Sequence, residues 1–315
     1  MANRIMADLP WVQEISADAV KHFAWGIGDN NPLWLTPKHG DATAPPCILY
    51  AIHETTVAPG MAQFRRIYKE VEWTWFQKIY LNETVSAETD LLETTNIGKN
   101  CLQIGQVKYL SSTEEVIAEA KVVCERTKDN SPIEKNYKYS EDELQNIERN
   151  ILAENRIGDV ARLWQNVKIE ETIGMLTKGP LSIMDIVAWS AGTTGVPKLD
   201  RNMSEGGLLD ETTCGPQITS WIAQLATDWI GDQGFLHRLN VKMSKQPGLG
   251  STTLIKGCVT DKRKIDEHFF AELSILAEDF SGKKIAEAKA LVILPSLNEK
   301  VLLPLTSRFS FNTLS

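Results

Sequence analysis

The chain contains an internal duplication, and this constrains its fold more than any other feature. Three pairs of similar segments occur in the same order in its two halves, about 165 residues apart. They are 23–29 (FAWGIGD) with 187–193 (VAWSAGT), 81–85 (LNETV) with 249–253 (LGSTT), and 117–121 with 285–289, which both read IAEAK. Solenoid units are only about 20–50 residues long. The repeat therefore predicts two copies of one whole domain, packed as a pseudo-dimer.

The composition is that of a folded protein with two domains of ordinary size. The chain has 315 residues, of which 43% are hydrophobic and 23% charged, and its net charge is -8. That charge gives no electrostatic attraction to nucleic acid or to an anionic membrane, and no segment approaches the roughly 20 apolar residues of a membrane span. The beginning of the sequence has no apolar signal-peptide region, so we expect a cytoplasmic protein.

The cysteines give no sign of a metal site or a disulfide framework. There are five, they are scattered, and no two have a Cys-x-x-Cys spacing. Structural zinc sites and disulfide scaffolds need clustered cysteines. We therefore expect no metal.

The first copy reads as two helices followed by strands. Ser16 is a suitable N-cap for a helix over 17–25, and Pro46 can begin an apolar helix over 47–55. Alternation then predicts a strand at 71–76. Further strands are expected at 83–95, 101–111 and 115–126.

A polar stretch separates the copies, and the second copy repeats the order of the first. We divide the chain into an N-terminal domain at 1–130, a linker at 131–158 and a C-terminal domain at 159–315. The C-terminal domain is expected to open with a strand at 163–170. Its helices are predicted to start after Ser182, which has the form of a capping box with Asp185, and at Gly215-Pro216. The four strands that complete it are expected at 235–245, 251–261, 267–278 and 284–294.

A long central helix wrapped by an antiparallel sheet is the hot-dog arrangement. One copy alone leaves a face of its helix and an edge of its sheet exposed, whereas two copies side by side join their sheets. We therefore predict an α+β double hot-dog fold.

The motifs around the first helix resemble those of MaoC-like acyl-thioester hydratases and dehydratases. In the first copy the similar segments are 23–34 (FAWGIGDNNPLW), 44–46 (APP) and 73–76 (WTWF). In the second copy they are 178–182 (KGPLS) and 228–232 (DWIGD). This resemblance extends over almost the whole chain. It implies the double hot-dog fold and the reversible addition of water to a 2-enoyl thioester of CoA or an acyl carrier protein, with no cofactor.

The family's hydratase motif, Gly-Asp-x-Asn-Pro-x-His, is incomplete in both copies. The first copy keeps Asp29, Asn31 and Pro32, but Trp34 stands in the position of the His. In the second copy Thr193, Gly195 and Lys198 replace Asp, Asn and His. The resemblance therefore places catalysis, if it occurs, in the first half of the chain.

The candidate catalytic residues are Asp29, Asn31 and His53. Asp29 is either an acid–base group or the cap of a turn, and Asn31 before Pro32 is also a turn former. His53 could take the role of the missing imidazole if it converged with Asp29, because His transfers protons at neutral pH. A lone His on an apolar helix is more often a hydrogen-bonded core residue.

Four further residues are candidates for binding the substrate. Trp34 occupies the altered motif position, Tyr50 could donate a hydrogen bond to a carbonyl, and Glu54 could act in place of His53. Lys198 could contact a CoA phosphate, although a solvated loop is the simpler interpretation. We also expect a homodimer, since pseudo-dimers of this kind can pair again through their remaining sheet surface.

Two alternatives to hydration remain open. With both motifs broken, the fold could support isomerisation, cyclisation or thioester hydrolysis in a specialised pathway. It could also be a non-catalytic acyl-binding subunit that stabilises an active relative.

Overall fold

The sheet and the helices fall into the two halves that the repeat predicts. The computed structural model describes residues 14–36, 42–53, 55, 65–127, 137–193 and 215–304. The first half contains helices α1 (Ala17–Gly26), α2 (Pro32–Leu35) and η1 (Pro46–Ala51), followed by strands β1 (Arg65–Trp75), β2 (Ser86–Ile97), β3 (Asn100–Leu110) and β4 (Val116–Thr127). Helix α3 (Glu141–Leu152) lies between the halves.

The second half has the same order of elements with one strand added at its start. Its elements are η2 (Trp164–Asn166), β5 (Thr172–Lys178), α4 (Ile183–Thr193), α5 (Gly215–Ile230), β6 (Phe235–Met243), β7 (Thr253–Ile265), β8 (His268–Asp279) and β9 (Lys284–Ile293). In the first half, the isolated bridge between Glu14 and Thr84 occupies the place of the β5–β7 pairing.

The nine strands of the described residues form one antiparallel sheet with an internal pseudo-twofold relation. The strand order is β2-β3-β4-β1-β6-β9-β8-β7-β5. Reading outward from the β1–β6 pair, β4 corresponds to β9, β3 to β8 and β2 to β7. The two IAEAK segments therefore lie on corresponding strands, β4 and β9, which accounts for their repetition. The double hot-dog fold predicted from the sequence is confirmed.

Strands β1 and β6 join the two half-sheets. Their register pairs Glu70 with Lys242, Val71 with Val241 and Trp73 with Leu239. The central apolar pairs are fully buried, and opposite charges face each other at one end. This pairing removes the exposed edge that each half-sheet would otherwise present.

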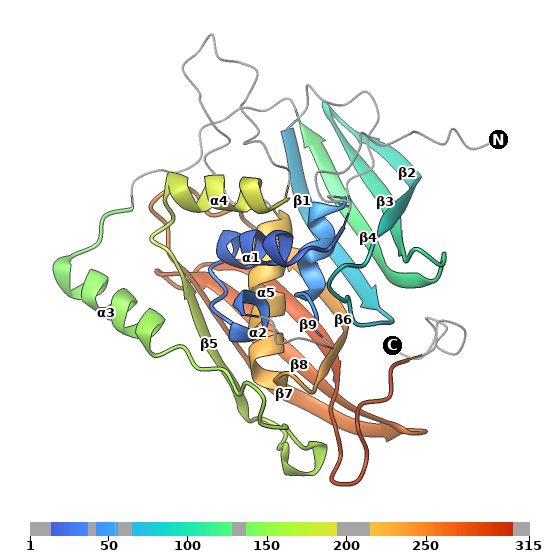
Figure 1. Ribbon diagram of the computed structural model, residues 1–315. Coiled ribbons are helices and arrows are strands. Elements are labelled where there is room, and N and C mark those ends of the chain that lie inside the picture. The colour runs from blue at the N-terminus through green and yellow to red at the C-terminus, as the bar shows by residue number, and fades with distance from the viewer. Residues whose placement is uncertain are drawn as a thin grey trace.

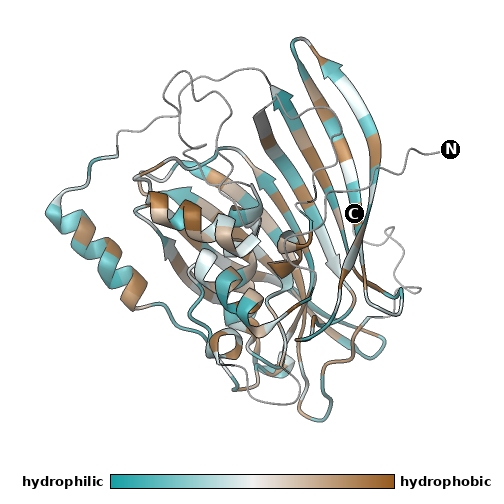
Figure 2. Ribbon diagram, turned by 45° about the horizontal axis from the view of Figure 1, so that its top comes forward, coloured by the Kyte–Doolittle hydropathy of each residue, from teal (hydrophilic) through white to brown (hydrophobic). Residues whose placement is uncertain are grey.

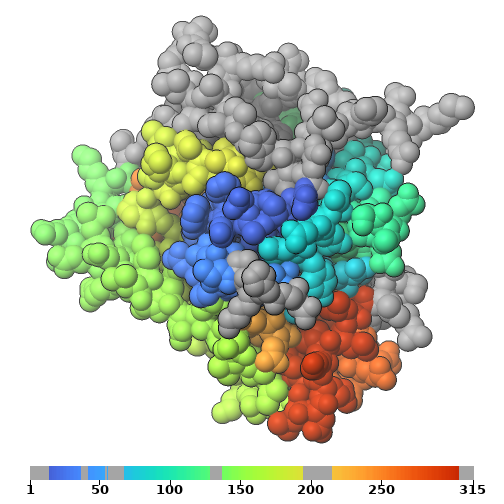
Figure 3. Space-filling view, viewed as in Figure 1, coloured from blue at the N-terminus to red at the C-terminus, as the bar shows by residue number. Residues whose placement is uncertain are grey.

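Helices α1, α4 and α5 lie on one face of this sheet, and α1 and α4 run side by side (Figure 1). Their contact is close because glycines lie at it. A Cβ on Gly26 would meet the carbonyl oxygen of Ala188 at 2.9 Å, and one on Gly192 would meet that of His22 at 2.6 Å. The first-half and second-half segments are accordingly in contact at the surface (Figure 3). The repeated helices thus meet each other in the structure.

Helix α5 is the central helix of the second half and lies between the sheet and α1. Every residue of α5 except Thr227 is buried. Helix α3, by contrast, extends away from the sheet with mixed polar and apolar residues on its surface (Figure 2), and only Ile147 in it is buried. Helix α5 is therefore part of the core, whereas α3 lies at the surface.

Several local predictions are confirmed. Ser16 accepts a hydrogen bond from the Ala19 amide at 3.1 Å and caps α1. Ser182 and Asp185 form the predicted capping box, with Asp185 Oδ2 accepting from the Ser182 amide at 2.7 Å. Helix α5 begins at Gly215 as expected.

Two predictions of local structure are wrong. The strand expected at 163–170 is replaced by the short 3₁₀ helix η2, and β5 begins only at Thr172. The helix expected at 47–55 is a six-residue 3₁₀ helix, η1, that ends before His53. Side chains compete here for backbone carbonyls: Trp75 Nε1 donates to Pro46 O at 3.1 Å, and the Tyr109 hydroxyl donates to His53 O at 2.8 Å. The Pro46 carbonyl could otherwise accept an α-helical hydrogen bond.

Replacing Gly192 by Ala should weaken the packing of α1 against α4. All three nearest atoms to the new Cβ would belong to the backbone at His22 and Phe23, so the helices must separate. We expect a loss of about 1–3 kcal/mol in the free energy of unfolding, measured by urea denaturation. The neighbouring Ala191 is exposed, so Ala191→Met should change it by less than about 0.5 kcal/mol. Equal effects of the two changes would contradict this packing.

Candidate functional site

A polar pocket of about 400 Å³ lies at the junction of the two halves. Its size is within the usual range for small-molecule sites. It is lined by the loop that follows α1 and by residues at and just after the end of α3. The end of β5 with the turn beyond it and one face of α5 complete the wall. The pocket therefore collects residues from both copies and from the predicted linker.

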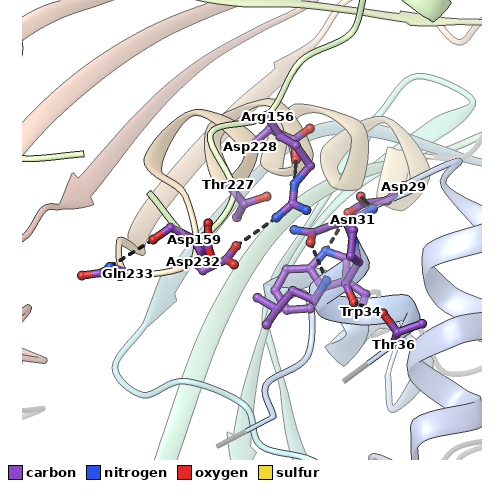
Figure 4. A network of polar contacts seen from close by, with 12 residues as sticks. Asp29, Asn31, Trp34, Thr36, Arg156, Asp159, Thr227, Asp228, Asp232 and Gln233 are labelled. Atoms are coloured by element: carbon purple, nitrogen blue, oxygen red, sulfur yellow. Dashed lines mark hydrogen bonds and ion pairs between the residues drawn. The ribbon is translucent and has the colours of Figure 1, made fainter. Parts of the chain in front are cut away.

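Asp29 is held in this pocket by the loop of the first copy. Its Oδ1 accepts a hydrogen bond from the Asn31 amide at 2.9 Å, and its Oδ2 accepts one from Trp34 Nε1 at 2.8 Å (Figure 4). The side chain is only 2% exposed. The turn-capping role considered for Asp29 is thus present, together with a buried position beside the cavity.

Trp34 stands where the resemblance places a His, and the two side chains differ in chemistry. An imidazole can both donate and accept a proton, whereas the indole of Trp is only a donor. Trp34 therefore orients Asp29 without providing a base. Asn31 also has a structural task, since its Oδ1 accepts from the Leu33 amide at 2.8 Å and caps α2.

Asp228 on α5 faces the same pocket from the second half. It is 7% exposed, and its Oδ1 has no hydrogen-bond partner among the described residues. Burial, together with the nearby charge of Asp29, raises the pKa of Asp228 to about 8. Asp228 is therefore protonated at neutral pH, which makes it a donor.

Burial also raises the pKa of Asp29 above its ordinary value, but its two hydrogen bonds and the charge of Lys178 oppose this. Because Asp29 alone of the two carboxyls accepts two hydrogen bonds, it is the better carboxylate. Of the two carboxyls, Asp228 is therefore the better proton donor and Asp29 the better acceptor.

Lys178 connects the halves at the floor of the pocket. From the end of β5, its Nζ donates to Ile27 O at 2.9 Å and to Gly28 O at 3.0 Å. These contacts hold the loop that carries Asp29 against the second copy. The cation also favours the ionised form of Asp29.

Two residues after α3 complete the charged cluster. Glu154 accepts a hydrogen bond from the Thr177 amide at 2.7 Å. Arg156 forms an ion pair with Asp232 at 2.9 Å, and its Nε lies 3.8 Å from Asp228 Oδ1. Figure 4 shows Arg156 between Asp228 and Asp232, with Asn31 below it. The predicted linker thus contributes side chains to the site.

The residues from α5 were missed by the sequence-based list of candidates, although the sequence contains a signal for them. Gln217, Trp221, Gln224 and Asp228 recur at steps of four, three and four, which places them on one face of a helix. Three of them are polar, and all four are buried. A polar stripe on a core helix predicts a cavity or a partner beside it.

The other predicted site residues lie elsewhere or outside the described residues. His53 does not line this pocket; its Nδ1 accepts from the Thr55 amide at 3.0 Å. Tyr50 is buried in the core, where its hydroxyl accepts from Trp73 Nε1 at 2.9 Å. Glu54 and Lys198 fall outside the described residues. The structure therefore brings together Asp29 and Asn31, with Trp34 behind them, but not His53.

The described part of the chain has no cluster of metal-ligating side chains and no helix that could span a membrane. Its His, Cys, Asp and Glu side chains form no group of three or more that could hold a metal ion. None of its helices is long and apolar enough to cross a membrane.

Solved structures of low sequence identity share this fold over nearly the full chain. A MaoC-like dehydratase matches with a TM-score of 0.68 and 13% identity, covering 93% of this chain and 98% of the other. A MaoC-like dehydratase from Phytophthora capsici matches with a TM-score of 0.53 and 11% identity, covering 89% and 93%. A Mycobacterium tuberculosis protein with a double hot-dog fold matches with a TM-score of 0.57 and 10% identity, covering 91% and 94%.

Comparisons at the level of sequence find no relative. No protein-family model matches the chain, and no curated protein sequence matches it. The structural matches establish the fold.

The raised pKa of Asp228 should make Asp228→Asn stabilising at high pH. Between the ordinary Asp pKa of 3.8 and the folded-state pKa of about 8, the folded state holds a proton that the unfolded state releases, so rising pH lowers wild-type stability. The Asn variant lacks this loss. Its Tm relative to the wild type should therefore rise between pH 5 and pH 8.5, as measured by thermal unfolding.

The exposed Asp159 provides the matched control. Asp159→Asn should leave the Tm difference from the wild type independent of pH over this range. Parallel Tm curves for Asp228→Asn and the wild type would show that Asp228 ionises normally.

Proposed function

We propose that this protein is a hydratase or dehydratase of an acyl thioester, in which two carboxyl groups replace the Asp–His pair. The observation that carries the proposal is the placement of Asp29 and Asp228 at one pocket, where the pKa of Asp228 is raised to about 8 and Asp29 accepts two hydrogen bonds that favour its ionised form. Two titrating groups with different protonation states in one cavity are typical of an acid–base pair. The fold shared with MaoC-like dehydratases supports the same reaction class.

In this proposal Asp29 is the base and Asp228 is the acid. As a water oxygen bonds to C3 of the 2-enoyl thioester, Asp29 takes one proton from that water. The electron pair of the C2–C3 double bond passes to C2, which receives the proton of Asp228. Dehydration runs the same transfers in reverse, with Asp228 removing the C2 proton and Asp29 protonating the leaving hydroxyl.

The charged neighbours fit these roles. Lys178 stabilises the Asp29 carboxylate and holds its loop in place. The Trp34 hydrogen bond fixes the direction of the same carboxylate. Arg156 lies close enough to Asp228 to stabilise the anion that forms when Asp228 releases its proton.

Isomerisation of the double bond is a second candidate function. It is favoured by the replacement of the motif His by Trp34, whose indole cannot accept a proton. Moving a proton between two carbons requires one base and no added water, and Asp29 could provide that base. The two reactions differ in whether solvent oxygen enters the acyl chain.

Incubation with 2-enoyl and 3-hydroxyacyl thioesters in oxygen-18 water tests the proposal. We expect label at C3 of the hydrated product, detected by mass spectrometry. Asp29→Asn and Asp228→Asn should each lower kcat/KM by about 10²–10⁴, and Asp159→Asn should not change it. Rearranged product without label would favour isomerisation instead. Unchanged turnover in both pocket variants would contradict the assigned roles.

A further inference from the structure

The pocket wall beside the proposed reaction centre is polar for several turns of α5. Gln224 lies one turn before Asp228, about 6 Å along the helix at 1.5 Å per residue, and Gln217 lies two turns before Gln224. Both glutamines are at least 95% buried. Gln217 donates to Gly26 O at 3.4 Å. Gln224 Oε1 has no hydrogen-bond partner among the described residues.

Further buried polar atoms of residues that line this pocket form no hydrogen bond to the described residues. They are Thr177 Oγ1, and Asp228 Oδ1 and Arg156 Nε, which lie 3.8 Å from each other as an ion pair. Leaving a buried polar group unpaired costs about 1–3 kcal/mol. A plain hydrocarbon chain placed here would keep these atoms unpaired and would exclude water from them. The pocket therefore favours a group that can form hydrogen bonds.

A neighbouring apolar cavity is too small to hold a long acyl chain instead. It is lined in part by Trp34 and has a volume of about 60 Å³, against about 400 Å³ for the polar pocket. Behind it, Trp73 and Trp75 are buried and stacked with ring centroids 5.1 Å apart. Aromatic side chains thus fill the core of the first half.

The charges at the pocket disfavour an anionic group. Four carboxyl side chains line it, against two cations, Lys178 and Arg156. The carboxyls belong to Asp29, Glu154, Asp185 and Asp228. Burial raises the pKa of Asp29, Glu154 and Asp228, because negative charge is poorly solvated in this pocket. An uncharged hydrogen-bonding group is therefore the better fit.

We propose that the acyl group is short and carries a hydroxyl a few carbons beyond the double bond, and that the Gln224 carboxamide binds this hydroxyl. The spacing of about 6 Å between Asp228 and Gln224 along α5 matches a hydroxyl near C5 when C2 lies at Asp228. Gln224 is then the residue that determines acyl specificity. This inference rests on the proposed function for the position of C2.

Binding of unreactive CoA thioethers tests the inference without turnover. S-(5-hydroxypentyl)-CoA and S-pentyl-CoA differ in one hydroxyl, and neither has the thioester carbonyl that the reaction requires. By isothermal titration calorimetry, we expect the hydroxylated compound to bind the wild type at least 10-fold more tightly. S-(4-carboxybutyl)-CoA should bind more weakly than the hydroxylated compound.

Gln224→Met keeps the shape of the side chain and removes its hydrogen-bonding groups. It should reduce the preference for the hydroxylated thioether to less than about 2-fold. Thr227→Val is the matched control, because Thr227 is on the same helix and does not line this pocket. It should keep the 10-fold preference.

The outcomes separate this inference from the proposed reaction. Equal affinities for the two thioethers in the wild type, an unchanged preference in Gln224→Met, or no binding of the hydroxylated compound would overturn it. A preference that depends on Gln224, found together with no oxygen-18 incorporation from any thioester, would support the hydroxylated ligand and reject the hydratase.

Discussion

The antiparallel pairing of β1 with β6 is the constraint on which the rest of the structure depends. It joins two half-sheets into one and fixes how the two copies face each other. In the joined molecule, α1 packs alongside α4. The loop after α1 lies against the end of β5 and one face of α5. The close approach at Gly26 and Gly192 makes this arrangement compact.

The site is a product of that arrangement, because neither copy contains it alone. Asp29 comes from the first half, whereas Asp228 and Lys178 come from the second, and Arg156 comes from the segment between them. Lys178 binds two carbonyls of the first-half loop and so keeps the two carboxyls at one pocket. In the proposed reaction, Asp228 from the second copy takes the role that the resemblance assigns to an imidazole at position 34.

The sequence predicted the architecture well and the site only in part. Repetition and alternation sufficed to locate β1–β4 and β6–β9 along the chain, since both are read directly from residue patterns. The 3₁₀ helix η1 was missed because its Pro46 carbonyl binds Trp75, which is distant in the sequence. Asp228 was missed for a similar reason. Its burial and the charge of Asp29 arise only when the two halves meet, although the polar stripe on α5 marked that face in advance.

The most direct test of the account is to determine whether one carboxyl at this pocket keeps its proton at neutral pH. Carbon-13 NMR of protein labelled at the Asp side-chain carboxyls, titrated from pH 4 to pH 10, measures this. We predict one resonance that titrates near pH 8 and is absent from Asp228→Asn. If every Asp carboxyl titrates below about pH 5, Asp228 does not keep a proton at neutral pH, and the proposed acid–base pair is wrong.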